Sequence, residues 1–149
     1  MDQKNHNTEI TISQEYPPEY IYKKCVEKWG VDYVKDNIAF TYGDTIFFAK
    51  GSDRLPEDLF VHEMTHTKQH REYPGGRDAW WDRYLIDDQF RLSQELIAYR
   101  NQYRWVVQNM KSPAKRFEYL MYMAQALSGK MYGNIISKLE AIQEIRKGV

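Results

Sequence analysis

Two histidines four positions apart, with a glutamate directly after the first, are the residues of this chain best suited to chemistry: His62, Glu63 and His66. In an α-helix, residues four positions apart lie on one face, so the two histidines stack one turn apart. Two such imidazoles can bind one zinc ion (Zn2+), and Glu63 can then act as a base on a water at the metal. We therefore expect a catalytic zinc site, although this short pattern can also arise by chance.

A catalytic zinc needs three protein ligands and one open position, so a third ligand must come from elsewhere in the chain. Glu95 is the first candidate, because its neighbours Leu96 and Tyr99 indicate a buried stripe on or near that face of a later helix. Two histidines on one helix and a glutamate on the next form the ligand set of the gluzincin peptidases. The alternative is that Glu95 is an exposed helix residue that pairs with Arg91.

His70 is the second candidate, because it follows His66 by four residues. Three ligands from one straight helix are difficult to combine, since the third lies another turn, about 6 Å, along the axis. The metzincin pattern would need glycine at position 69 and histidine at position 72, where this chain has Gln69 and Glu72. We therefore expect His70 at the edge of the cleft, beside a metal ligand or the substrate, or else exposed to solvent.

Length and composition favour one soluble domain. The 149 residues suffice for a hydrophobic core, and the 21 basic residues equal the 21 acidic ones, so no net charge favours nucleic acid or a membrane surface. The single cysteine, Cys25, excludes an intrachain disulfide and a thiolate zinc cluster. The first residues lack an apolar signal core, and no apolar stretch approaches the length of a membrane span. We expect a cytoplasmic protein, and one packaged in a phage particle would look the same.

The elements that must position these residues begin with a polar segment. We expect residues 1–15 to form a flexible N-terminus and residues 16–149 to form one domain. Apolar residues at helical spacing predict a helix over residues 19–29. β-branched and aromatic runs at residues 38–42 and 45–49, separated by Gly-Asp, predict a hairpin.

The remainder of the chain reads as helical. Proline and two acids at the start, and Pro-Gly-Gly at the end, bound a helix over residues 55–73 that carries the two histidines. Four further helices are predicted over residues 79–85, 87–110, 113–127 and 135–147. The expected fold is α+β and mainly helical, with an N-terminal helix and a small β-hairpin packed on the histidine helix, followed by a C-terminal helical bundle.

Four segments together resemble a family of small, phage- and bacterium-encoded predicted zinc metallopeptidases that are similar to minimal gluzincins. The segments are residues 62–66 (HEMTH) with Gln69, residues 80–85 (WWDRYL), residues 95–99 (ELIAY) and residues 126–134 (ALSGKMYGN). Many zinc enzymes share the first motif, whereas the combined order is more specific, and the match spans about residues 42–145. The resemblance implies a zincin-like domain in which His62, His66 and Glu95 bind zinc and Glu63 is the general base.

The resemblance also implies features around the metal. The strand at residues 45–49 resembles the edge strand that gluzincins place above the metal to hold an extended peptide. Gluzincins often carry an acid four residues after the ligand glutamate, where it supports a zinc histidine. Tyr99 stands at that position here, and its hydroxyl could form a hydrogen bond in place of the acid.

These residues predict a zinc-dependent metallopeptidase acting on a peptide or protein substrate. Glu63 would take the proton from a zinc-bound water that attacks the carbonyl. Tyr132, in a glycine-containing break, is the first candidate donor to the oxyanion and Tyr99 the second, while packing alone is the alternative for both. Two other functions stay open: a zinc amidase acting on cell-wall peptides, and a metal-binding phage assembly or interaction protein without turnover. The oligomeric state is open as well.

Overall fold

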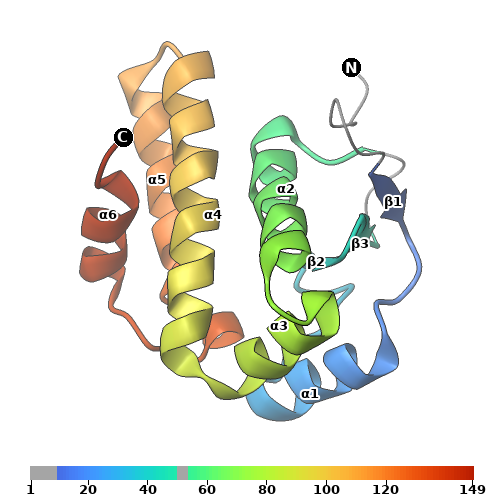
Figure 1. The fold of residues 1–149 in the computed structure, drawn as a ribbon. Coiled ribbons are helices and arrows are strands. Elements are labelled where there is room, and N and C mark those ends of the chain that lie inside the picture. The colour runs from blue at the N-terminus through green and yellow to red at the C-terminus, as the bar shows by residue number, and fades with distance from the viewer. Residues whose placement is uncertain (1–9, 50–53) are drawn as a thin grey trace.

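The computed structural model describes residues 10–49 and 54–149, and this part of the chain is mainly helical (Figure 1). In chain order its elements are β1 (Thr11–Ser13), α1 (Glu19–Trp29), β2 (Ala39–Tyr42), β3 (Thr45–Phe48), α2 (Glu57–Glu72), α3 (Gly76–Ile86), α4 (Asp88–Asn109), α5 (Pro113–Leu127), the 3-10 helix η1 (Lys130–Tyr132) and α6 (Lys138–Arg146). The mainly helical α+β class is therefore confirmed. None of the described helices is long and apolar enough to cross a membrane.

The three strands form one sheet in the order β1-β3-β2. β2 and β3 are antiparallel and joined by the predicted two-residue turn, in which Gly43 has a φ of 61°. β1 pairs with β3 in parallel. β3 is therefore the central strand, and the expectation that residues 45–49 form an edge strand above the metal is wrong.

The third strand comes from the segment expected to be flexible. Residues 11–13 form β1, so that expectation is wrong for them, while residues 1–9 lie outside the described residues. Ile10 is buried in a small cluster with Ile46, Phe48, Leu55 and Phe60, against which Ile12 packs. This cluster joins the sheet to the start of α2.

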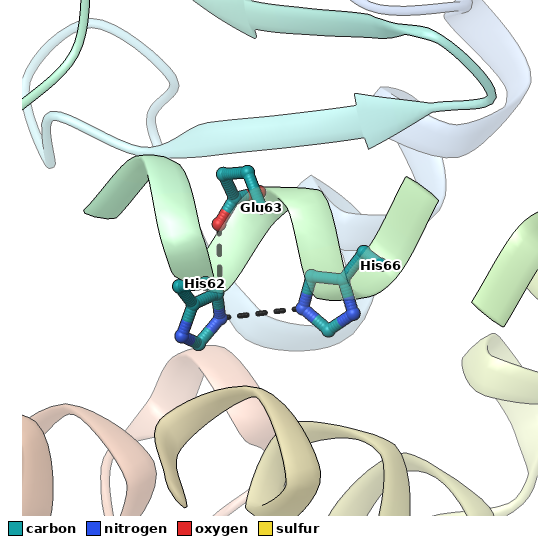
Figure 2. Close-up of side chains that lie close together, drawn as sticks. All are labelled: His62, Glu63 and His66. Atoms are coloured by element: carbon teal, nitrogen blue, oxygen red, sulfur yellow. Dashed lines mark hydrogen bonds and ion pairs between the residues drawn. The ribbon is translucent and has the colours of Figure 1, made fainter. Parts of the chain in front are cut away.

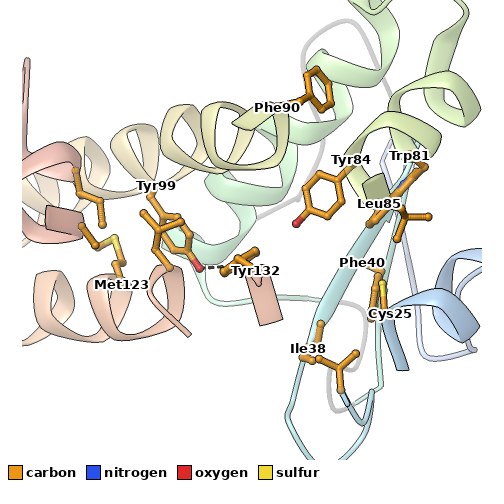
Figure 3. Packing of buried hydrophobic residues seen from close by; sticks show 14 of the residues in the cluster. Cys25, Ile38, Phe40, Trp81, Tyr84, Leu85, Phe90, Tyr99, Met123 and Tyr132 are labelled. Carbon is orange, nitrogen blue, oxygen red and sulfur yellow. Dashed lines mark hydrogen bonds between the residues drawn. The ribbon is translucent and has the colours of Figure 1, made fainter. Parts of the chain in front are cut away.

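Helix α2 lies between the sheet and α4, and α5 and α6 lie on the other side of α4 (Figure 1). The main core is aromatic around α3, where Trp80, Trp81 and Tyr84 are buried. Figure 3 shows Trp81 and Tyr84 within this core. The buried face of α2 is largely polar by contrast, and consists of Asp58, Phe60, His62, Glu63, Thr65, His66, Thr67 and His70. Buried polar groups are costly unless they are hydrogen-bonded, so this face must find partners on β2 and α4.

Candidate metal centre

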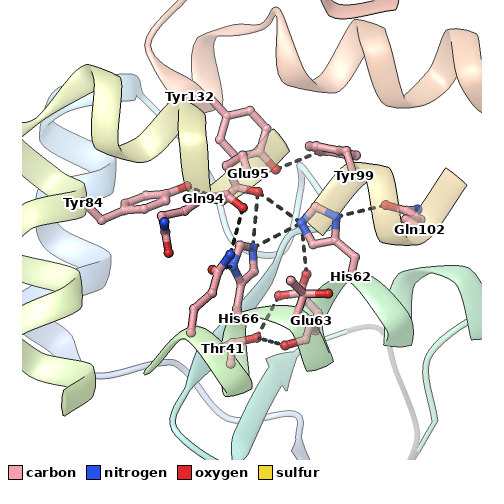
Figure 4. A network of polar contacts seen from close by, with 12 residues as sticks. Thr41, His62, Glu63, His66, Tyr84, Gln94, Glu95, Tyr99, Gln102 and Tyr132 are labelled. Carbon is pink, nitrogen blue, oxygen red and sulfur yellow. Dashed lines mark hydrogen bonds and ion pairs between the residues drawn. The ribbon is translucent and has the colours of Figure 1, made fainter. Parts of the chain in front are cut away.

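The polar face of α2 meets α4 at three side chains. His62 and His66 point from α2 toward Glu95 of α4, and all three residues are buried (Figure 4). The two imidazole Nε2 atoms are 3.2 Å apart, and Glu95 Oε1 lies 3.1 Å from that of His62 and 3.2 Å from that of His66. In a tetrahedral zinc site with bonds of about 2.0–2.1 Å, neighbouring ligand atoms lie about 3.3 Å apart. The three atoms thus have nearly the spacing that one zinc ion requires.

The hydrogen bond on the far side of His62 determines which nitrogen is free. His62 Nδ1 lies 2.9 Å from Gln102 Oε1, and Gln102 Nε2 donates to Asp58 Oδ2 at 2.8 Å. A carboxylate accepts hydrogen bonds, so the amide group must face Asp58 and the amide oxygen must face His62. Nδ1 of His62 therefore donates, which leaves the lone pair of its Nε2 directed at the cluster.

His66 is oriented in the same way by a second glutamine. Its Nδ1 lies 2.8 Å from Gln69 Oε1, and Gln69 Nε2 donates to the backbone carbonyl of Gln94 at 3.1 Å. The carbonyl fixes the amide, so Nδ1 donates, and in the neutral ring Nε2 carries the lone pair. The sequence did not predict that these two glutamines orient the histidines; Tyr99 was the expected hydrogen-bond partner of a zinc histidine. The available signal for Gln102 was its position two turns after Glu95 on the same helix.

The electrostatics of the cluster favour a positive charge among its three donor atoms. Burial raises the pKa of Glu95, but the positive charge of a protonated His66 and the polar contacts with both imidazoles outweigh this and hold it well below its usual range. Burial lowers the pKa of His66, whereas the adjacent Glu95 carboxylate raises it more, to a net value above the usual one. Two nitrogens and one carboxylate oxygen form a donor set that suits zinc.

Glu63 stands to one side of these three atoms. Its Oε1 accepts a hydrogen bond of 2.9 Å from Thr41 Oγ1 on β2, and its Oε2 lies 3.7 Å from His62 Nε2 (Figure 2). His62, Glu63 and His66 could together hold a metal ion. Glu95 lies closer to both imidazoles, which favours it as the third ligand. Burial raises the pKa of Glu63 above its usual value.

The second oxygen of Glu95 is already occupied. Tyr84 of α3 is buried and donates to Glu95 Oε2 at 2.7 Å. This contact leaves Oε1 to face the two histidines. Sequence reasoning did not assign Tyr84 to the site, although it lies in one of the four segments that carry the resemblance.

Tyr99 and Tyr132 lie together on the other side of the cluster. Their hydroxyl oxygens are 2.9 Å apart, and the ring of Tyr99 packs against that of His62 with centroids 4.4 Å apart. Both tyrosines line a cleft of about 510 Å³ with His62 and Glu63. Tyr132 therefore lies beside the cleft, and its role as an oxyanion donor stays a prediction.

Arg91 connects the two tyrosines that flank Glu95. It is 1% exposed, and it donates from Nε to the carbonyl of Tyr132 at 3.0 Å and from Nη1 to the carbonyl of Tyr84 at 2.6 Å. Its Nη2 pairs with Asp88. The alternative in which Glu95 is exposed and pairs with Arg91 is therefore wrong.

Gly133 makes the Arg91 contact possible. Its φ is 92°, and a Cβ atom at this position would lie 2.8 Å from Arg91 Nη2. Because Arg91 is buried and bonded on three sides, its guanidinium has little room to move away. A residue without a side chain is therefore required after Tyr132.

His70 is buried on α2 near the cluster, but it is not one of the three side chains whose donor atoms converge. It is 2% exposed, so the expectation of solvent exposure is wrong. Its Nδ1 accepts a hydrogen bond of 3.0 Å from the backbone N–H of Gly43, which puts the proton of the neutral ring on Nε2. That nitrogen has no hydrogen-bond partner among the described residues, and with His66 and Glu95 the ring lines a cavity of about 30 Å³. Burial lowers the pKa of His70 to about 3.

Comparisons with known proteins do not extend this description. The sequence matches no protein-family model and no curated protein, and the fold matches no solved structure.

Proposed function

We propose that the protein is a zinc-dependent peptidase in which His62, His66 and Glu95 hold the metal. The observation that carries the proposal is the convergence of three donor atoms, the Nε2 atoms of His62 and His66 and Oε1 of Glu95. Each of the two imidazoles is held at its Nδ1 by the amide oxygen of a glutamine. A structural zinc would be closed by a fourth protein ligand, whereas a catalytic one keeps a position open beside a base. Glu63 and the adjacent cleft suit the catalytic case. The resemblance to small gluzincin-like peptidases points the same way.

Each residue around the metal has a distinct task in this proposal. When bound, zinc supplies a Lewis acid that polarises a carbonyl and acidifies water. Glu63 would take a proton from the attacking water at Oε2, because Thr41 already occupies Oε1, and would later give that proton to the leaving amine. The hydroxyl group of Tyr132 donates a hydrogen bond to the carbonyl oxygen of the substrate as negative charge develops there.

The substrate backbone pairs with β2 rather than β3. In an antiparallel pair, every second residue of an outer strand directs its backbone N–H and C=O groups away from the partner strand. In β2 these residues are Thr41 and Ala39. The carbonyl of Thr41 already accepts a hydrogen bond of 2.9 Å from Trp81 Nε1. The peptide therefore pairs at Ala39, which lines the cleft.

Zinc content and peptide cleavage test the proposal together. Protein purified without chelator should carry about one zinc, and Glu95→Ala should lose it. Glu63→Gln should retain zinc and lose cleavage of a mixed peptide library by at least about 100-fold, because the general base is removed. Glu72→Gln, an exposed position on the same helix, is the matched control and should change neither result.

The possible failures have different meanings. Wild-type protein that takes up no zinc after reconstitution contradicts the metal site itself. Zinc binding without cleavage of any peptide instead favours the metal-binding assembly protein. Cleavage that is unchanged in Glu63→Gln contradicts the assigned base.

A further inference from the structure

The cleft beside the metal centre contains a buried carboxylate, that of Asp58. Asp58 is 9% exposed and lines the cleft together with His62 and Glu63. It precedes His62 by four residues on α2, so the two side chains lie on one face and about 6 Å apart along the helix axis. A group bound at Asp58 would therefore be one helical turn from the proposed reaction site.

Within residues 10–49 and 54–149, Asp58 has little compensation for its charge. In that part of the chain its side chain has one hydrogen bond, from Gln102 Nε2 to Oδ2, and no pairing with a cation. Its place in the first turn of α2 gives partial stabilisation from the helix dipole. A buried carboxylate without a cation is costly, and a bound cation would offset that cost.

The remaining lining of the cleft fits a long basic side chain. Its charged groups are carboxylates, and none of the described lining residues is lysine or arginine. Asp36 and Glu118 each pair with an exposed lysine, at 3.9 Å and 3.3 Å, and such pairs are weak in water. Apolar and aromatic walls suit the alkyl part of lysine or arginine, and are formed by Ile38, Phe48, Leu59, Tyr119, Tyr122 and Met131.

We infer that Asp58 forms a subsite for the lysine or arginine side chain of a substrate residue next to the cleaved bond. The inference rests on the proposed function for the position of that bond. Neighbouring residues of an extended peptide are about 3.4 Å apart, so a long side chain beside the cleaved bond reaches one turn along α2. The carboxylate of Asp58 pairs with the cation, while Gln102 continues to hold Oδ2.

Peptide binding to zinc-loaded Glu63→Gln protein tests the subsite without depending on cleavage. The probes are three fluorescein-labelled heptapeptides of glycine and alanine that differ in a central lysine, norleucine or glutamate, and the readout is fluorescence anisotropy. The lysine peptide should bind at least about 10-fold more tightly than the norleucine peptide, with the glutamate peptide weakest. Equal binding of the lysine and norleucine peptides would overturn the inference.

Asp58→Asn in the same background removes the charge but keeps an oxygen that accepts from Gln102 Nε2. With both proteins loaded to full zinc occupancy before the measurement, the lysine preference should fall below about 3-fold. Glu57→Gln removes a charge from the same helical turn outside the cleft, and should keep the preference. A preference that survives Asp58→Asn would overturn the inference.

The inference and the proposed function can fail separately. If wild-type protein cleaves none of the peptides while the lysine preference is present and depends on Asp58, the subsite stands and the peptidase does not. If wild-type protein cleaves peptides with no preference for basic residues, the peptidase stands and the subsite is overturned. Should Asp58→Asn fail to fold, the comparison of the three peptides with native Asp58 still decides the inference.

Discussion

Helix α2 carries three histidines at the same four-residue spacing. The two in its middle and the one in its last turn form opposite hydrogen bonds at Nδ1. In the middle, His62 and His66 donate from Nδ1 to glutamine oxygens, so in the neutral rings their Nε2 atoms carry the lone pairs. In the last turn, His70 accepts at Nδ1 from the N–H of Gly43, so its Nε2 carries the proton. A metal needs the lone pair. Spacing alone therefore does not decide which histidines can be ligands, because the partner of the opposite nitrogen also decides it.

The two regions differ because different elements face them. The middle of α2 faces α4, whose side chains Glu95 and Gln102 offer acceptor oxygens. The last turn faces the β2–β3 turn, which offers a backbone donor, and Trp80, whose ring centroid lies 4.3 Å from that of His70. An acceptor beside Nδ1 thus leaves Nε2 available for a metal, whereas a donor beside Nδ1 leaves a neutral ring with its hydrogen on Nε2.

The largest expected effect comes from removing one histidine from each region. His66→Ala should weaken zinc binding by more than about 100-fold, because a ligand is lost, whereas His70→Ala should change it by less than about 3-fold. Competition with a chromophoric chelator measures both affinities. An equal loss in the two variants would show that the difference between the regions has no bearing on the metal.

A smaller effect should follow from removing an orienting amide. Gln102→Leu should weaken zinc binding by about 10- to 100-fold, since His62 loses the acceptor that fixes its tautomer. Asn101→Ala is the matched control, because Asn101 bonds Thr65 across the same helix pair without touching an imidazole. If the two variants bind zinc equally well, the orientation of Nδ1 is not what prepares the ligands.

The smallest effect concerns the last turn and the pH dependence of stability. The pKa of His70 is about 3 in the folded protein and about 6.5 when unfolded, so the unfolded chain takes up a proton first as pH falls. The stability contributed by the neutral ring is therefore complete above pH 6.5 and is lost progressively below it. His70→Gln should reduce the pH dependence of the free energy of unfolding between pH 6.5 and 5.5 by about 1 kcal/mol. Urea denaturation of both metal-free proteins at the two pH values measures the difference, and parallel pH curves would contradict the assignment.

The local part of the site could be predicted from the sequence. The spacing of His62 and His66 brings two imidazoles together on any helix, and the neighbours of Glu95 indicated its buried face. The partners that set the chemistry were not predictable in this way. Thr41 and Glu63 are 22 residues apart, and His62 and Gln102 are 40 apart. Helical periodicity does not say which polar side chains will meet across the fold.

For the fold as well, the locally stabilised elements were predictable and the nonlocal pairing was not. Periodicity and chain breaks located α1 and the hairpin, since their stabilising contacts lie close in the sequence. β1 was missed because its three residues are too few for a clear alternating pattern and its partner, β3, is distant in the chain. The order of the strands, and hence which strand borders the cleft, depends on that one nonlocal pairing.

The close approach of Gly133 to Arg91 has a consequence for how this chain can vary. Any side chain at position 133 would press on the guanidinium that holds the carbonyls of Tyr84 and Tyr132, on both sides of Glu95. Position 133 contributes no functional group, yet substitutions there should be selected against, as they would be at a ligand position. The set of residues that constrains the evolution of this site is therefore larger than the set proposed to bind the metal and to act in catalysis.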